Sequence, residues 1–139
     1  MRVPDWDVRL ANWASYWLDA PFSWGHCDCN ILALEALQCL TGKPHADAFR
    51  GRYDSAAGAL RLQRDDDYDL ARYLTAQGAQ IIPRNFQQRG DILVVMRDGF
   101  ACGHVCFGER ALCAAPDHPV CWGSTEALLD LGAVIYRIG

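Results

Sequence analysis

A cysteine at the predicted start of a helix is the first feature of this sequence that could do chemistry. Asp28 is a good N-cap residue and the apolar residues after it predict a helix, so Cys29 falls in the first helical turn. The unpaired N–H groups and the positive end of the helix dipole stabilise a thiolate there, and the same N–H groups can donate hydrogen bonds to an oxyanion. The neighbouring carboxylate works in the opposite direction, because it raises the pKa of a thiol. Cys29 is therefore the candidate nucleophile and the thiol expected to react fastest; a buried, inert cysteine beside a capping aspartate is the alternative.

The candidate base is His104, which lies within a predicted strand. Gly103 beside it would let another backbone or a substrate approach closely. An imidazole on a strand that faces a helix N-terminus can take the proton of a thiol. A core histidine bonded to a carbonyl is the alternative. His26, His45 and His118 are weaker candidates because each lies in a predicted loop, although His26 and His118 could approach the cleft.

The spacing of the cysteines allows a second kind of chemistry. On a strand, Cys102, His104 and Cys106 point to one face. If that face meets the helix that begins near Cys29, these side chains and Cys27 could converge on a zinc ion or an iron–sulfur cluster, since thiolates and imidazole are suitable ligands. Buried thiols beside an active site would give the same pattern, and no CxxC motif is present. We therefore expect no metal and no cofactor, and keep the metal site as an alternative.

The elements expected around these residues are helices first and antiparallel strands second. Apolar spacing and end signals predict helices over residues 5–19, 28–40, 54–64 and 67–77. After Pro83, short apolar runs between turn residues predict strands over residues 92–96, 101–107, 111–115, 120–122 and 133–138, with a loop over residues 116–119. This order predicts an α+β fold in which N-terminal helices pack on a C-terminal antiparallel sheet.

Length and composition limit the class of protein. The chain has 139 residues, 51% of them apolar, which predicts a single globular domain over residues 1–139. Its net charge of -4 argues against a nucleic-acid partner. No apolar run reaches the roughly 18 residues of a membrane span, and the N-terminus lacks the apolar run of a signal peptide. We expect a protein made in the cytoplasm whose seven cysteines are mostly reduced thiols.

The motifs around the two candidate residues resemble one family. The sequence FSWGHCDC over residues 22–29 is similar to the aromatic-x-Trp-Gly and Asp-Cys signature of the NlpC-type papain-like cysteine peptidases. The Gly90-Asp91 pair before an apolar strand, and His104-Val105 on the next one, are similar to the Gly-Asp and His-Val strands of that family. The resemblance implies a papain-like fold with a catalytic cysteine and histidine at the positions already singled out.

The resemblance is closer still to a small phage-encoded branch of this superfamily. That branch has a Trp-rich N-terminal helix, a Trp-Gly-x-x-Asp-Cys motif and a Phe-Arg-Gly-Arg-Tyr segment, which appears here as FRGRY over residues 49–53. The similarity covers roughly residues 20–122. It assigns Cys29 as the catalytic nucleophile and His104 as the catalytic base.

Two positions depart from the family pattern. The tyrosine that precedes Trp-Gly and helps the oxyanion site falls on Phe22, which has no hydroxyl. The third polar residue, usually His, Asn or Gln, falls near residues 113–115, which read Cys-Ala-Ala. Asp117 or His118 could substitute if the predicted loop folds back. A dyad without an orienting group reacts more slowly.

The resemblance also implies a function. Family members are hydrolases that cut the peptide stems of bacterial peptidoglycan, and in phages such domains sit in the tail tip or its assembly machinery. We therefore expect a viral protein of the phage tail, located in the virion, with other tail proteins as partners, peptidoglycan as substrate and no membrane span. The alternative is a catalytically weak or inactive structural component of the tail tip, with or without a cysteine-rich metal or iron–sulfur site.

Overall fold

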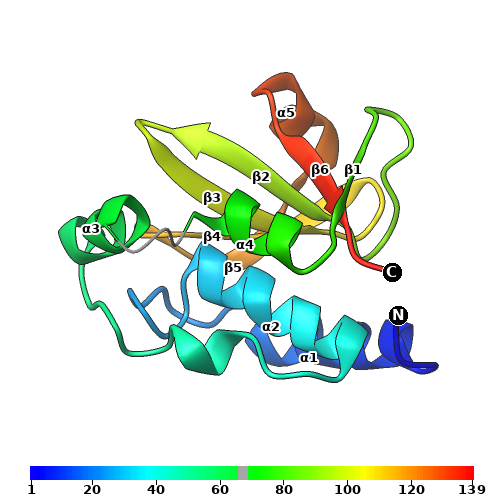
Figure 1. The fold of residues 1–139 in the computed structure, drawn as a ribbon, viewed down its shortest axis with the longest axis horizontal. Coiled ribbons are helices and arrows are strands. Elements are labelled where there is room, and N and C mark those ends of the chain that lie inside the picture. The colour runs from blue at the N-terminus through cyan, green and yellow to red at the C-terminus, as the bar shows by residue number, and fades with distance from the viewer. Residues whose placement is uncertain (66–68) are drawn as a thin grey trace.

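The computed structural model is an α+β domain in which N-terminal helices pack on a C-terminal antiparallel sheet (Figure 1), as predicted. It describes residues 1–65 and 69–139. The helical elements are α1 (Trp6–Trp17), α2 (Cys29–Thr41), the short 3-10 helix η1 (Ala46–Ala48), α3 (Ala56–Asp65), α4 (Leu70–Ala76) and α5 (Thr125–Asp130). The first four predicted helices are confirmed, except that the expected start of the fourth at residue 67 lies outside the described residues. The sequence did not predict η1 or α5.

The strands form one six-stranded sheet in the order β1-β6-β2-β3-β4-β5, with every neighbouring pair antiparallel. Their bounds are Gln80–Ile82 (β1), Ile92–Arg97 (β2), Phe100–Cys106 (β3), Arg110–Ala115 (β4), His118–Ser124 (β5) and Val134–Arg137 (β6). The sequence missed β1, a short strand at the sheet edge. The predicted loop over residues 116–119 is also wrong at its end, because His118 and Pro119 already belong to β5 and leave a tight hairpin connection.

Helix α2 is the centre of the domain, and its ends are set by its sequence. Asp28 caps its start by accepting a hydrogen bond from the Ile31 N–H, and Gly42 ends it with the left-handed backbone (φ 73°) that glycine adopts at little cost. Its leucines, isoleucine and alanines lie on several faces, and nine of its thirteen residues are buried. The helix therefore packs against α1 on one side and the sheet on the other.

The two faces of the sheet have different cores. On β2, Ile92 and Val94 point into the main core around α2, while Leu93 and Val95 point into a smaller core formed with α5. The register carries this alternation onto β3, where Gly103 pairs with Val94 and so faces α2. A Cβ at Gly103 would lie 2.9 Å from the Cβ of Ala33 in α2, so glycine is what allows the helix and the strand to approach this closely.

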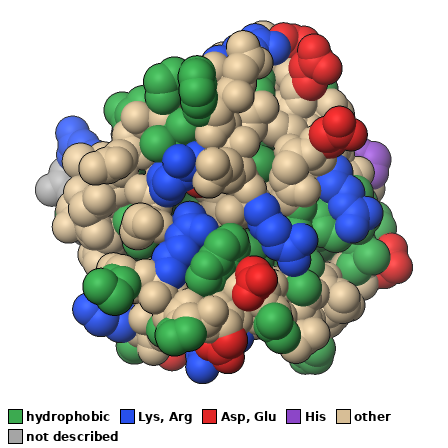
Figure 2. All heavy atoms as spheres, turned by 90° about the vertical axis from the view of Figure 1, so that its right-hand side faces the viewer, with side chains coloured by type: hydrophobic (Ala, Val, Ile, Leu, Met, Phe, Trp, Pro, Cys, Tyr) green, Lys and Arg blue, Asp and Glu red, His purple; other side chains and the backbone are tan. Residues whose placement is uncertain are grey.

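The Gly-Asp pair at residues 90–91 ties the two ends of the chain to the sheet. Asp91 is fully buried and accepts hydrogen bonds from Arg137 at 2.8 and 2.9 Å, and Arg2 lies 4.0 Å away. Figure 2 shows Lys and Arg side chains gathered on the face that carries both chain termini. A Cβ at Gly90 would lie 3.1 Å from the Trp6 ring, so this glycine also serves packing. This motif of the resemblance therefore has a structural role in the fold.

Candidate active site

The start of α2 is held by one buried carboxylate. Asp28 is 1% exposed and accepts three hydrogen bonds: from the Ile31 N–H at 2.9 Å, the Gly25 N–H at 2.8 Å and the Tyr53 hydroxyl at 2.6 Å. The carboxylate therefore caps the helix and also fixes the loop that precedes it. Cys29 is the first residue of α2, as predicted. The Asp28 hydrogen bonds to Gly25, before Cys29, and to Ile31, after it, fix its position.

The FRGRY segment over residues 49–53 makes hydrogen bonds to the same loop, which precedes α2. Arg50 donates a hydrogen bond to the His26 carbonyl at 2.9 Å and forms an ion pair with Glu35 of α2. The Gly51 N–H donates to the Gly25 carbonyl at 3.0 Å, and Tyr53 reaches Asp28. The sequence marked this segment as a motif but did not show its role, which is to position the loop before the candidate nucleophile.

Strand β3 lies beside the start of α2 with one edge unpaired. The ladder between β3 and β4 consists of Val105↔Leu112 and Cys106↔Ala111, so the first half of β3 has no β4 partner. The side-chain carboxamides of Asn30 and Gln63 take the place of the missing strand.

Asn30 accepts a hydrogen bond from the Gly103 N–H at 2.8 Å and donates one to the Ala101 carbonyl at 2.8 Å. Gln63 of α3 makes both hydrogen bonds to Ala101, each at 3.1 Å. The backbone groups that β4 leaves free are thus satisfied. No local sequence signal predicts either role, because the geometry depends on where β3 and β4 separate.

His104 lies on β3, as predicted, but on the face of the strand that points away from the α2 packing. It pairs with Leu93, and Leu93 belongs to the core on the α5 side. The ring is 5% exposed, and within residues 1–65 and 69–139 neither ring nitrogen has a hydrogen-bond partner. Burial, followed by the charge of Arg97, lowers the pKa of His104 to about 4. The imidazole is therefore neutral at pH 7 and both its nitrogens are available.

Cys29 reaches β3 at the unpaired edge. Its thiol donates to Asn30 Oδ1 at 3.7 Å and lies near the Cys102 thiol and the Gly103 N–H, both of which affect its pKa. Cys29 and His104 are not hydrogen-bonded to each other, since neither ring nitrogen has a partner among the described residues. The structure brings the nucleophile to the strand that carries the base, two residues away from it.

The electrostatics of this contact favour Cys102 over Cys29 as the thiol that ionises first. The hydrogen bond from Cys29 lowers the pKa of the half-buried Cys102, with a further lowering from the charge of Arg97. The same hydrogen bond, together with burial and the Asp28 charge, raises the pKa of Cys29. The helix start alone predicted Cys29 as the most reactive thiol. In this resting arrangement burial and Asp28 work against that prediction.

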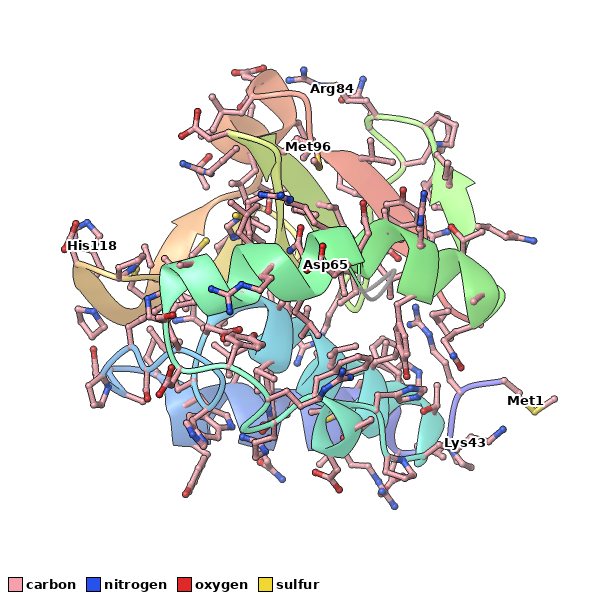
Figure 3. The ribbon with its side chains drawn as sticks, turned by 60° about the vertical axis from the view of Figure 1, so that its left-hand side comes forward. Met1, Lys43, Asp65, Arg84, Met96 and His118 are labelled. Carbon is pink, nitrogen blue, oxygen red and sulfur yellow. The ribbon has the colours of Figure 1, made fainter. Side chains whose placement is uncertain are left out.

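Residues 113–115, where a third polar residue was expected, follow the end of the β3–β4 pairing. The last pair is Val105↔Leu112, and Cys113 packs on the side of the sheet that also carries Leu93, the partner of His104. His118 cannot substitute by the predicted loop folding back, because it lies exposed at the start of β5, at the far end of that hairpin (Figure 3).

Phe22, the residue at the tyrosine position of the NlpC-type resemblance, is part of a cluster of aromatic rings in edge-to-face contact. Its ring meets the Trp24 ring edge-to-face at 4.8 Å, and Trp24 meets Phe100 of β3 at 6.2 Å. Trp24 is half-buried, so the cluster anchors the loop to β3 while remaining partly open to solvent.

The metal alternative finds no support in the described part of the chain. No group of three or more His, Cys, Asp or Glu side chains there is placed to hold a metal ion. Cys106 shares a strand face with His104, as predicted, but packs with Leu128 and Leu129 of α5, away from Cys29. His45, the other buried histidine, bonds to Tyr73 at 2.6 Å and is a structural residue.

Comparison with known proteins gives a family and no named relative. Residues 1–129 match the family model described as "Domain of unknown function (DUF6950)". No curated protein matches the chain significantly. Within residues 1–65 and 69–139, no helix is long and apolar enough to cross a membrane.

Proposed function

Since the chain belongs to the family described as Domain of unknown function (DUF6950), we propose that it is a papain-like, NlpC-type cysteine hydrolase with Cys29 as nucleophile and His104 as base. One observation carries this proposal. A cysteine fixed as the first residue of a buried helix meets the free edge of a strand on which a buried imidazole has no hydrogen-bond partner among the described residues. Buried polar groups are otherwise nearly always paired, so an unpaired one on the strand that Cys29 approaches supports a functional site there.

The chemistry would be acyl transfer through a thioester. Cys29 Sγ attacks an amide carbonyl and its proton passes to His104. The N–H groups of the first residues of α2 would stabilise the oxyanion, since the Asp28 cap accepts its helix hydrogen bond from the Ile31 N–H and not from theirs. His104 then protonates the leaving amine, and water hydrolyses the thioester. Formation of the direct contact requires Cys29 to leave Cys102 and the His104 ring to turn from the α5 side of the sheet toward the free edge of β3; catalytic contacts often tighten only when substrate binds.

We propose peptide stems of bacterial peptidoglycan as the substrate and the phage tail as the location, with other tail proteins as partners. The support is the similarity of residues 22–29 and 49–53 to the phage-encoded branch. Both segments also make hydrogen bonds that position the loop before Cys29. In Figure 3 these loops lie together at one end of α2, below the sheet hairpin that carries His118.

The test is digestion of purified peptidoglycan by the reduced protein. New amine and carboxyl ends in the soluble muropeptides should appear with the wild type and disappear with Cys29→Ala. Cys39→Ala is the matched control, because Cys39 lies half-buried near the other end of the same helix and should leave cleavage unchanged. Cleavage by the Cys29→Ala protein, or no cleavage by any form, would refute the hydrolase.

A second candidate function is a structural tail component that turns over slowly or not at all. It is favoured by the resting electrostatics, since burial lowers the pKa of His104 to about 4 and raises that of Cys29, so no thiolate–imidazolium pair exists at rest. An experiment on phage particles distinguishes the two candidate functions. Cys29→Ala should leave particles assembled and slow wall penetration if the domain is a hydrolase, and should have no effect on infection if it is structural. Deletion of the domain should disrupt tails only in the structural case.

A further inference from the structure

Cys29 is held close to Cys102 through the Asn30 carboxamide, whose Oδ1 lies 3.7 Å from Cys29 Sγ. Asn30, the residue after Cys29, binds the carbonyl of Ala101 and the N–H of Gly103, the residues on either side of Cys102. A single amide side chain thus spans Cys102 and pins it beside the start of α2. Gln63 anchors the same stretch of β3 from α3, through both backbone groups of Ala101.

The other cysteines are held elsewhere. Cys27 is buried in the loop before α2 and pairs with Ser23, Cys39 lies towards the C-terminal end of α2, Cys106 packs against α5, and Cys113 and Cys121 face each other across β4 and β5. Cys29 and Cys102 therefore form a pair separate from the Cys113–Cys121 pair.

The two members of the pair differ in access to solvent. Cys29 is 7% exposed, whereas Cys102 is half-buried and on the same strand face as the charge of Arg97. A small oxidant meets Cys102 first. Both the exposure and the neighbouring positive charge favour attack at that sulfur.

We propose that Cys29 and Cys102 form a reversible disulfide, with Cys102 as the residue that is oxidised and Cys29 as the residue that resolves it. The Cys102 thiolate attacks a peroxide O–O bond, forming a sulfenic acid; with hydrogen peroxide the displaced oxygen leaves as water after taking up a proton. The Cys29 thiol then attacks the sulfenic sulfur, the S–S bond forms and a second water leaves. Two thiols lose two electrons in total, peroxide gains them, and a dithiol reductant reverses the reaction by exchange.

The disulfide would inactivate the site, a consequence that rests on the function proposed above. Cys29 in an S–S bond has no nucleophilic sulfur and no proton for His104 to take. The protein would then be inactive under oxidising conditions and active after reduction. Resolution by Cys29 competes with irreversible oxidation of Cys102 to the sulfinic acid, and it leaves Cys29 in a disulfide that a dithiol can reduce.

The experiment is disulfide mapping of the full chain after treatment with an equimolar amount of hydrogen peroxide. The intact mass should fall by two hydrogen atoms. Trypsin cuts after Arg97 and Arg110, so Cys102 is released in the peptide 98–110, linked to the peptide 10–50 that contains Cys29. Fragmentation assigns the bond among Cys27, Cys29 and Cys39 on one side and Cys102 and Cys106 on the other.

Two matched variants test whether the linked peptide contains Cys102 or Cys106. Cys102→Ala should abolish the linked peptide and leave sulfinic acid or no oxidation at Cys29, while Cys106→Ala, a change in the same peptide, should retain the link. Thermal unfolding checks that both variants fold. A link that survives in Cys102→Ala, or accumulation of sulfinic acid at Cys102 in place of the link, would overturn the proposal.

Activity provides a separate readout. Cleavage of peptidoglycan should be lost when the linked peptide forms and restored in full by dithiothreitol, and Cys102→Ala should lose this reversibility. If Cys29-dependent cleavage occurs but no link forms, the redox proposal alone fails. If the link forms and no substrate is cleaved, the hydrolase alone fails.

Discussion

Asp28 and His104 are both buried polar side chains of the candidate site, at 1% and 5% exposure, yet their surroundings are opposite. Asp28 accepts three hydrogen bonds from the loop, the helix and the FRGRY segment. His104 has no hydrogen-bond partner for either ring nitrogen within the described residues. At the start of α2 the buried carboxylate has its hydrogen-bond donors within the fold, whereas on β3 the buried imidazole has no hydrogen-bond partner among the described residues.

This difference indicates that Asp28 stabilises the fold, whereas His104 does not stabilise it through hydrogen bonds. A side chain that satisfies several backbone groups contributes to stability, and its removal leaves those groups unpaired. A buried imidazole without hydrogen-bond partners is desolvated and adds no hydrogen bond to the fold, and the hydrolase proposed above gives it a role as the base. The two residues should therefore respond to substitution in opposite ways.

The largest effect is expected at Asp28. Asp28→Ala leaves the Gly25 and Ile31 N–H groups and the Tyr53 hydroxyl without their acceptor, and should lower the free energy of unfolding by about 3–5 kcal/mol. Urea unfolding at neutral pH measures it. Asp5→Ala is the control, since Asp5 is exposed and pairs only with Arg9, and should cost less than about 0.5 kcal/mol. Equal effects of the two substitutions would show that the Asp28 network does not stabilise the fold.

His104 should contribute a pH dependence in place of a stabilising bond. Its pKa in the folded chain is about 4 against an ordinary 6.5, so the unfolded chain binds a proton that the folded chain does not over that interval. Stability is therefore fully present above pH 6.5 and falls as the pH drops to about 4, by about 3 kcal/mol from this group.

The variant His104→Leu isolates this contribution. It should change stability at pH 7 by less than about 1 kcal/mol, because no hydrogen bond is lost, and should remove about 3 kcal/mol of the acid destabilisation between pH 6.5 and 4. Unfolding curves at a series of pH values measure both. His118→Ala, at an exposed position on β5, should leave the pH profile as in the wild type. An unchanged profile in His104→Leu would mean that the buried imidazole titrates normally.

The comparison also shows what the sequence could and could not predict. The Asp-Cys helix start, the strand that carries the histidine and the α+β order follow from local signals: a cap, an apolar period and turn residues. The face on which His104 lies depends on the pairing of β3 with β2, which no local signal contains. The contact with Cys102 depends in turn on Asn30, an unremarkable residue by type, reaching a strand more than seventy positions away.

The smallest and most specific effect is expected at residue 113. Cys113 follows the last β3–β4 pair and packs on the same side of the sheet as Leu93, the partner of His104; under the proposed NlpC-type function, a polar residue near this position would orient the imidazole. Cys113→Asn supplies an acceptor for one ring N–H, which favours the protonated ring and should raise the pKa of His104 from about 4 by about 1 unit. The titration of the His104 ring protons by NMR measures it. Cys121→Asn is the matched control, because Cys121 pairs with Cys113 on the neighbouring strand but is exposed and one strand farther from β3. A rise in the first variant alone, with faster Cys29-dependent cleavage, would place the missing orienting group at residue 113. The same pKa in both variants would mean that β4 turns away from His104 before that residue, and that the imidazole is oriented by the substrate itself.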